Sequence, residues 1–321
     1  MIEKNEIITC KSYHSLCDYH YDYPNLEDVP PTGVVHVPLD QIEEFFNRID
    51  GNGHTYVVVS SCSDFGLAIQ AEDPAWKDML KWLGMQIGPS LGYSGVKMPV
   101  RVEEKKCKIT DPYSIKCHSW TRATIPSIPK NVHHWFVTNL MFFPDPSRYE
   151  FLKDDDRHKK FTAIPFGIAE GKEDEIYEAM KESRPSKEKI NKIYVSWNDY
   201  TLERYELRKG LMDWQSYIKS DCLTVNLPGD GQDSYEDYLE NLSKHKYVIS
   251  PPGNGADCYR TLESIYMRCF TFVESTPCNS MTKLPVYEYQ NLDDIIGCYN
   301  ENHQLADALW NQPEKKLSYW K

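Results

Sequence analysis

One segment of the sequence combines glycines, an arginine and a glutamate in an order suited to binding phosphate and ribose groups. It runs from Tyr247 to Glu263 and consists of an apolar stretch, a glycine-rich turn and a helical pattern. A helix that follows such a turn offers backbone N–H groups and a partial positive charge to a phosphate. Arg260 lies early in the helical pattern, where its guanidinium could contact phosphate oxygens through two hydrogen bonds. Glu263 shares that helix face and could accept hydrogen bonds from ribose hydroxyls.

The same reasoning extends to neighbouring residues and leaves a simpler interpretation open. Glycines in the turn let the backbone approach a ligand closely. Asn198 and Thr201 follow the strand predicted at 192–196 and could reach the phosphates or the base. Alternatively, Arg260 and Glu263 form an ordinary surface pair, and Arg204 is a helix-surface charge paired with Glu203 or Glu206. The ligand-binding residues that we predict in this part of the chain are Asn198, Thr201, Arg204, Ser250, Gly253, Asn254, Gly255, Arg260 and Glu263.

Residues 246–269 resemble the donor-binding segment of exostosin-like glycosyltransferases, including soluble viral and bacterial relatives. The shared motif is S-P-P-G-N-G-x-D-C-x-R, and the chain departs from the family at 268–272, where a glycine and a proline are usual. Weaker matches in the same order occur at 135–140, 164–168, 194–204 and 284–286. The resemblance implies a GT-B fold, in which two Rossmann-like domains face each other across a cleft. It also implies an inverting transfer that requires no metal.

Asp64 is the candidate catalytic base. It follows the buried strand predicted at 56–60, and relatives have a similar segment there, although Ser61 and Cys62 replace their His-Asn pair. An inverting transferase needs a base that takes the proton from the attacking hydroxyl. Capping of a following helix is an equally good explanation for this aspartate. Three histidines are alternative bases, although a lone histidine is more often structural: His54, His118 and His133.

Alternating strand and helix patterns predict an α/β protein with parallel sheets. The region 1–180 is expected to form an acceptor-side domain, 181–300 a donor-binding domain, and 301–321 a helix that packs back on the first domain. The stretch up to Pro31 is expected to be irregular, and a capping box is expected at Asp233, with Ser234 and Glu236. The predicted strands lie at 33–37, 56–60, 135–140, 162–168, 192–196, 223–226, 247–250 and 270–273, and the predicted helices at 38–50, 76–83, 170–189, 202–217, 233–244 and 257–268.

Composition excludes several classes of function. With 48 acidic and 36 basic residues, the net charge is -12, which argues against nucleic acid and anionic membrane surfaces as partners. The ten cysteines form no C-x-x-C pair, and no apolar stretch is long enough for a membrane span or a signal sequence. We therefore expect a soluble, cytoplasmic protein without a disulfide framework.

No metal or cofactor is expected from sequence spacing. No histidine, cysteine or aspartate cluster has metal-ligand spacing, and Asp154–Asp156 lie in a charged run that is typical of a solvated loop. The predicted partners are a UDP- or GDP-linked sugar donor and a glycan acceptor. Three alternatives remain: a non-catalytic nucleotide-sugar or glycan-binding protein, a metal-dependent GT-A transferase, and a nucleotide-binding kinase or dehydrogenase. The last two are disfavoured by the missing metal motif and by the late position of the glycine-rich turn.

Overall fold

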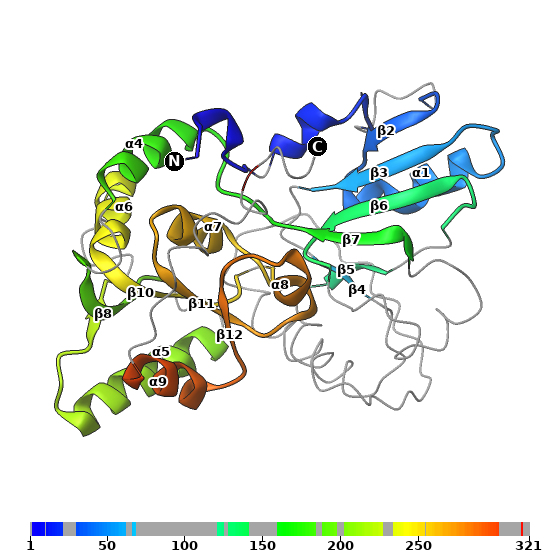
Figure 1. Cartoon of the computed structure of the whole chain (residues 1–321). Helices are drawn as coiled ribbons and strands as arrows, with labels where there is room; N and C mark the ends of the chain where they lie inside the picture. The colour runs from blue at the N-terminus through cyan, green and yellow to red at the C-terminus, as the bar shows by residue number, and fades with distance from the viewer. Residues whose placement is uncertain are drawn as a thin grey trace, which may run out of the picture.

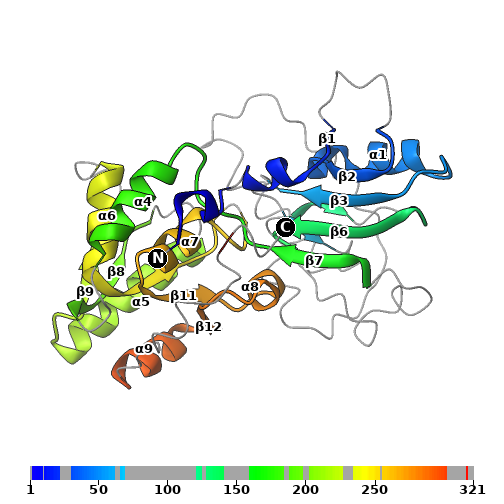
Figure 2. The same ribbon diagram turned by 45° about the horizontal axis from the view of Figure 1, so that its top comes forward.

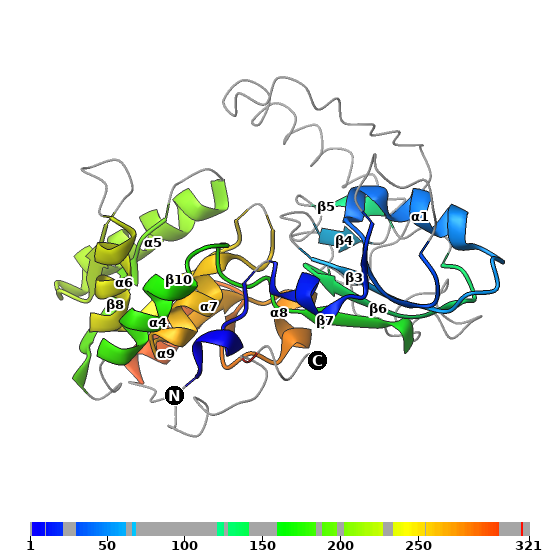
Figure 3. The ribbon, with the colours of Figure 1, turned by 90° about the horizontal axis from the view of Figure 1, so that it is seen from above.

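The computed structural model is an α/β structure with two parallel five-stranded sheets and several helices (Figure 1). Each sheet occupies its own half of the molecule, as the view from above also shows (Figure 3). The predicted α/β class with parallel sheets is therefore confirmed at this level. The structure describes residues 2–9, 11–21, 30–61, 66–68, 121–124, 128–140, 159–183, 188–197, 202–226, 234–253, 255–301 and 316.

The first sheet has the strand order β1-β2-β3-β6-β7, and all of its neighbouring strands are parallel (Figure 2). Its strands are β1 (Tyr19–His20), β2 (Gly33–His36), β3 (Tyr56–Ser60), β6 (Val132–Thr138) and β7 (Phe161–Ile164). The strands predicted in this half are all present, with small shifts of their ends. They read as apolar runs because parallel strands are buried.

Two predictions for the first 50 residues differ in outcome. The helix expected at 38–50 is present as a 3-10 turn, η3 (Leu39–Gln41), followed by α1 (Ile42–Ile49). The expectation that the chain is irregular up to Pro31 was wrong, because this stretch forms η1 (Lys4–Glu6), η2 (Ser12–Leu16) and the edge strand β1. A two-residue strand is specified by its partner β2, so local patterning could not reveal it.

The second sheet has the order β12-β11-β10-β8-β9. Its strands are β8 (Ile190–Val195), β9 (Leu223–Val225), β10 (His245–Ser250), β11 (Phe270–Glu274) and β12 (Tyr287–Tyr289). Side chains of β8 and β10 alternate between two cores. Tyr194 and Val248 pack with α6 (Tyr235–Lys244) and α7 (Tyr259–Tyr266), whereas Tyr247 and Ile249 lie in the core that includes residues of α5 (Leu202–Ile218) and α9 (Leu292–Asn300).

The two halves are packed together through the N-terminal segment and α4 (Glu173–Glu182). The helix α4 lies beside α6 and α7, as Figure 3 shows. The Ile8 N–H donates to the Tyr266 hydroxyl across 2.9 Å, and both residues belong to one apolar core. The domain limits at 180 and 300 stay a prediction, and the helix expected in 301–321 lies outside the described residues.

Several element ends differ from the predictions. Ser234, not Asp233, caps α6, and its reciprocal partner is Asp237 rather than Glu236. The helix expected at 257–268 begins only at Tyr259. In the second half of the molecule, three elements were not predicted: the strand β12, α8 (Pro277–Thr282) and α9. A short parallel pair, β4 (Gly66–Ala68) and β5 (Thr121–Thr124), completes the described structure. No helix in the described part of the chain is long and apolar enough to cross a bilayer.

Candidate functional site

The order of the second sheet places a ligand-binding position between β8 and β10. The chain adds β9 on one side of β8 and then β10, β11 and β12 on the other. Ligands of open parallel sheets bind just beyond the carboxyl ends of the strands at such a reversal. The strand β10 ends at Ser250, so the glycine-rich loop at 251–258 starts at this position and leads into α7.

Arg204 is hydrogen-bonded to the backbone of the glycine-rich loop. Its Nε–H donates to the Pro252 carbonyl across 2.6 Å, and its Nη2 donates to the Pro251 carbonyl across 3.3 Å. A Cβ atom on Gly253 would lie 3.1 Å from the same Nη2, which explains why a residue without a side chain suits this position. The guanidinium is thus used to shape the loop, and its predicted contact with phosphate stays a prediction.

Glu263 is buried and held by two tyrosines of α6. The side chain is 5 % exposed; Oε1 accepts from the Tyr235 hydroxyl and Oε2 from the Tyr238 hydroxyl, each across 2.9 Å. Burial raises the pKa of Glu263, while these hydrogen bonds and the nearby Arg260 charge oppose the shift. Each carboxylate oxygen has a second lone pair, so the tyrosines do not exhaust its capacity as an acceptor.

Arg260 has an unused hydrogen-bond donor in this network. Its Nε atom is buried, and among the described residues it has no hydrogen-bond partner. A buried N–H without a partner costs on the order of 1–3 kcal/mol, so a bound acceptor would relieve a real penalty. The surface-pair interpretation of Arg260 and Glu263 does not fit, because Glu263 is buried and takes part in a network with α6.

Sequence reasoning missed the two tyrosines. Tyr235 and Tyr238 are three residues apart at the start of α6, so they share one helix face. The Lys172 ammonium lies 4.8 Å from the centre of the Tyr235 ring. Their spacing was visible in the sequence, but only the packing of α6 beside α7 shows that both hydroxyls reach one carboxylate.

Ser250 links the end of β10 to the helix. It is 2 % exposed, and its Oγ is hydrogen-bonded to Thr261 Oγ1 at 3.1 Å and to Cys258 Sγ at 3.3 Å. The Gly253 N–H donates to the Gly255 carbonyl across 2.9 Å and closes the turn. In this structure Ser250 therefore supports the loop, and its predicted contact with the donor stays a prediction.

Asp257 joins the two halves at the start of α7, and it was not singled out from the sequence. Its N–H donates to Asn139 Oδ1 and its Oδ2 accepts from the Phe166 N–H, both across 2.8 Å. Asn139 follows β6 with a φ of 52° and Phe166 follows β7. Burial raises the pKa of Asp257, whereas hydrogen bonds from Phe166, Thr261 and Cys258 oppose that shift. The carboxyl edge of the first sheet is thereby fixed against the glycine-rich loop.

Several predicted residues lie outside the described structure. They are Asp64, His118, Asn198, Thr201, Asn254 and the run Asp154–Asp156. Two of the alternative bases are described. His54 precedes β3 and His133 lies at the start of β6, so both are near the amino edge of the first sheet, opposite the carboxyl edge that meets α7. This position disfavours both as bases.

Three histidines gather at the carboxyl edge of the first sheet. His14 lies in η2, while His20 and His36 end the neighbouring strands β1 and β2. One candidate ligand atom from each lies within 4.8 Å of the other two. We expected no metal-ligand cluster because these histidines are far apart along the chain. The parallel pairing of β1 with β2 brings His20 and His36 side by side in the structure.

His36 is the buried member of this histidine cluster. It is 2 % exposed, and its Nε2 is hydrogen-bonded to Ser61 Oγ at 3.0 Å. Burial and the neighbouring His14 and His20 lower the pKa of His36 to about 3, so its imidazole is neutral at physiological pH. Its Nδ1 is buried without a hydrogen-bond partner among the described residues.

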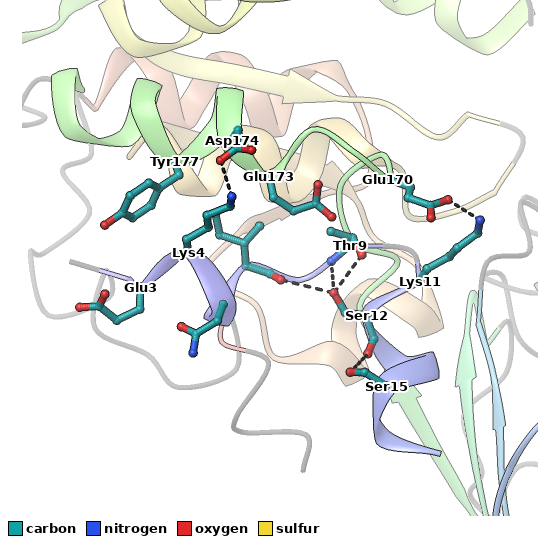
Figure 4. A pocket seen from close by; sticks show the side chains of 12 residues that line it. Glu3, Lys4, Thr9, Lys11, Ser12, Ser15, Glu170, Glu173, Asp174 and Tyr177 are labelled. Atoms are coloured by element: carbon teal, nitrogen blue, oxygen red, sulfur yellow. Dashed lines mark hydrogen bonds and ion pairs between the residues drawn. The ribbon is translucent and has the colours of Figure 1, made fainter. Parts of the chain in front are cut away.

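A hollow lies elsewhere, between the N-terminal segment and α4 (Figure 4). Its volume is about 690 Å³, and it is open to solvent. Lys4 is paired with Asp174 and Lys11 with Glu170 along its wall. The charges within each of these exposed ion pairs neutralise one another, so the hollow has fewer features of a binding site than the network around Arg260.

Comparison with known proteins does not assign the chain to a family. No family model matches the chain, and no curated protein matches it significantly.

Proposed function

We propose that the chain is a glycosyltransferase that transfers a sugar from a nucleoside-diphosphate sugar to a hydroxyl of a glycan acceptor. The observation that supports this most is the buried Nε of Arg260, which has no hydrogen-bond partner among the described residues and lies next to a glycine-rich loop at the reversal point of a parallel sheet. A diphosphate supplies the acceptor oxygens that this donor lacks. The proposal includes the GT-B arrangement, with the donor on the second half and the acceptor entering from the first.

In the proposed mechanism, Arg260 and the N-terminus of α7 stabilise the negative charge of the departing diphosphate. Glu263 accepts from the ribose hydroxyls while Tyr235 and Tyr238 hold the carboxylate in place. Asp64 takes the proton of the acceptor hydroxyl as it attacks the anomeric carbon, with inversion. No metal is assigned to the diphosphate in this scheme.

The proposal is tested by measuring binding of UDP, GDP and their sugar conjugates by thermal shift and calorimetry, with and without EDTA. A ligand at about one hundred times its dissociation constant adds ~2.7 kcal/mol of stability, enough to raise Tm by a few degrees. We expect one nucleoside diphosphate to bind and its affinity to be insensitive to EDTA.

Arg260→Ala is expected to weaken that binding roughly 10- to 150-fold, equivalent to about 1.5–3 kcal/mol for a lost charge-assisted contact. Arg208→Ala is the matched control, because Arg208 is on α5 and its guanidinium lies over the Tyr205 ring. Equal affinity of the Arg260→Ala and Arg208→Ala variants would refute the assignment of Arg260. Binding without sugar transfer to any glycan would identify a binding protein instead of an enzyme.

A further inference from the structure

The histidine cluster in the first half of the molecule has no role in the proposed transferase reaction. The three rings of the histidine cluster come from three separate elements: η2, β1 and β2. Their centroids are 3.7 Å apart for His14 and His36, 4.9 Å for His14 and His20, and 6.0 Å for His20 and His36. Strands β1 and β2 are parallel and place His20 directly beside His36.

We propose that His14, His20 and His36 form a binding site for a divalent transition-metal ion such as Zn²⁺. Zinc bonds to imidazole nitrogens at about 2.0–2.1 Å, and a tetrahedral arrangement separates the nitrogens by roughly 3.4 Å. The candidate ligand atoms already lie within 4.8 Å of one another. His14 is partly buried and His20 is exposed, so small side-chain rotations close the remaining gap.

The buried His36 supplies an independent second observation. Its Nδ1 has no hydrogen-bond partner among the described residues, although the side chain is only 2 % exposed. The other ring nitrogen, Nε2, contacts Ser61 Oγ at 3.0 Å. Metal-bound histidines are usually oriented by a hydrogen bond from the ring nitrogen that does not bind the metal. Ser61 fits that supporting role and leaves Nδ1 to bind the ion.

Three imidazole ligands favour borderline ions such as Zn²⁺ over Mg²⁺ or Ca²⁺, which prefer oxygen ligands. Zinc sites with three protein ligands keep a fourth position for water or another ligand. The metal would connect η2 to the carboxyl ends of β1 and β2, so metal binding should also stabilise the fold.

The experiment uses the full chain after removal of metal with a chelator and desalting. Zn²⁺ is titrated by calorimetry, and Co²⁺ is titrated by visible absorption to report tetrahedral coordination. We expect one equivalent to bind and to raise Tm. His14→Ala and His20→Ala should each weaken binding about tenfold or more, since even supporting residues of metal sites contribute 10- to 100-fold.

His54→Ala is the matched control, because His54 is exposed and lies near the opposite edge of the first sheet. His20 is exposed, so its variant should keep the Tm of the metal-free protein. Failure to bind Zn²⁺ or Co²⁺, or binding that His14→Ala and His20→Ala leave as tight as His54→Ala does, would overturn the proposal. Neither outcome depends on nucleotide binding, so the two proposals can fail separately.

Discussion

At the scale of single residues, the most informative feature is a buried polar network around Glu263. Each carboxylate oxygen accepts one hydrogen bond from a tyrosine hydroxyl. The Nε of the neighbouring Arg260 has no hydrogen-bond partner in the part of the chain that the structure describes. Buried polar groups are stabilising only when they are satisfied. A buried network that leaves one N–H donor without an acceptor lowers the free energy of unfolding if its role is only structural. The same network beside a glycine-rich loop is well suited to bind a ligand that supplies the acceptor.

A second residue-scale feature is His245, at the start of β10. Its Nδ1 lies 2.7 Å from the Asn241 carbonyl, which can only accept, so Nδ1 carries the proton of the neutral ring. Its Nε2, 2.8 Å from Thr224 Oγ1, then accepts from that hydroxyl. Burial lowers the pKa of His245, although the Asn241 carbonyl opposes the shift, and three lysines add to it: Lys189, Lys192 and Lys244.

This lowered pKa predicts a loss of stability in mild acid. The native state binds fewer protons at His245 than the unfolded state, so the free energy of unfolding falls as pH drops below about 6.5. Urea denaturation at pH 7.5 and pH 5.5 should show a steeper loss for the unmodified chain than for His245→Asn. The asparagine keeps a donor for the Asn241 carbonyl but does not titrate. Parallel losses in the two proteins would rule out a contribution from His245.

At the scale of secondary-structure elements, α6 matters because it carries both tyrosines that hold Glu263. Its first turn is fixed by a reciprocal capping box: Ser234 Oγ accepts from the Asp237 N–H across 3.1 Å, and Asp237 Oδ2 accepts from the Ser234 N–H across 3.0 Å. Tyr235 is the first residue of the helix. The position of its hydroxyl therefore depends on how this helix begins.

Ser234→Ala should destabilise the chain by about 1 kcal/mol, the usual cost of losing an N-cap side chain. Ser216→Ala is the control, because Ser216 lies within α5, where its hydroxyl bonds to the Met212 carbonyl and alanine is a good helix former. Denaturant unfolding with a two-state fit measures both. If Ser234→Ala were no less stable than Ser216→Ala, the capping box would make no net contribution.

At the scale of the whole molecule, the link between Asn139, Phe166 and Asp257 joins two parallel sheets at the start of α7. These hydrogen bonds hold the carboxyl edge of the first sheet against the glycine-rich loop of the second. A second connection between the halves comes from the N-terminal residues, because Ile8 is hydrogen-bonded to Tyr266 in a shared core. We infer that the two sheets do not unfold independently.

Two substitutions of Asn139 separate the hydrogen bond from the backbone conformation. Asn139→Gly removes the acceptor of the buried Asp257 N–H and should cost roughly 1–3 kcal/mol. Asn139→Ala removes the same acceptor but keeps a Cβ in the left-handed region at φ 52°, so it should be less stable than Asn139→Gly by about 1–2 kcal/mol. Equilibrium unfolding followed by far-UV and near-UV signals tests this. Full stability of Asn139→Gly would show that the link is not needed.

The sequence by itself determined most of the regular elements and the donor-binding hypothesis. The strand at 56–60 and the helix at 42–49 have hydrophobic patterns that span their length, because burial is set by the period of the element. The glycine-rich loop, Arg260 and Glu263 are contiguous in the chain, so their motif was visible without a fold. The helix starts were harder, since Ser234 and Asp233 are both good caps and the sequence does not choose between them.

The tertiary structure alone decided which residues distant in sequence meet. Tyr235 and Tyr238 reach Glu263 only because α6 packs beside α7, and Asp257 meets Asn139 across 118 positions of the chain. The histidine cluster exists only because β1 pairs with β2, and β1 is too short to carry a pattern of its own. Periodicity reports the burial of one element at a time, whereas sites are built from contacts between elements, and those depend on strand order and helix packing.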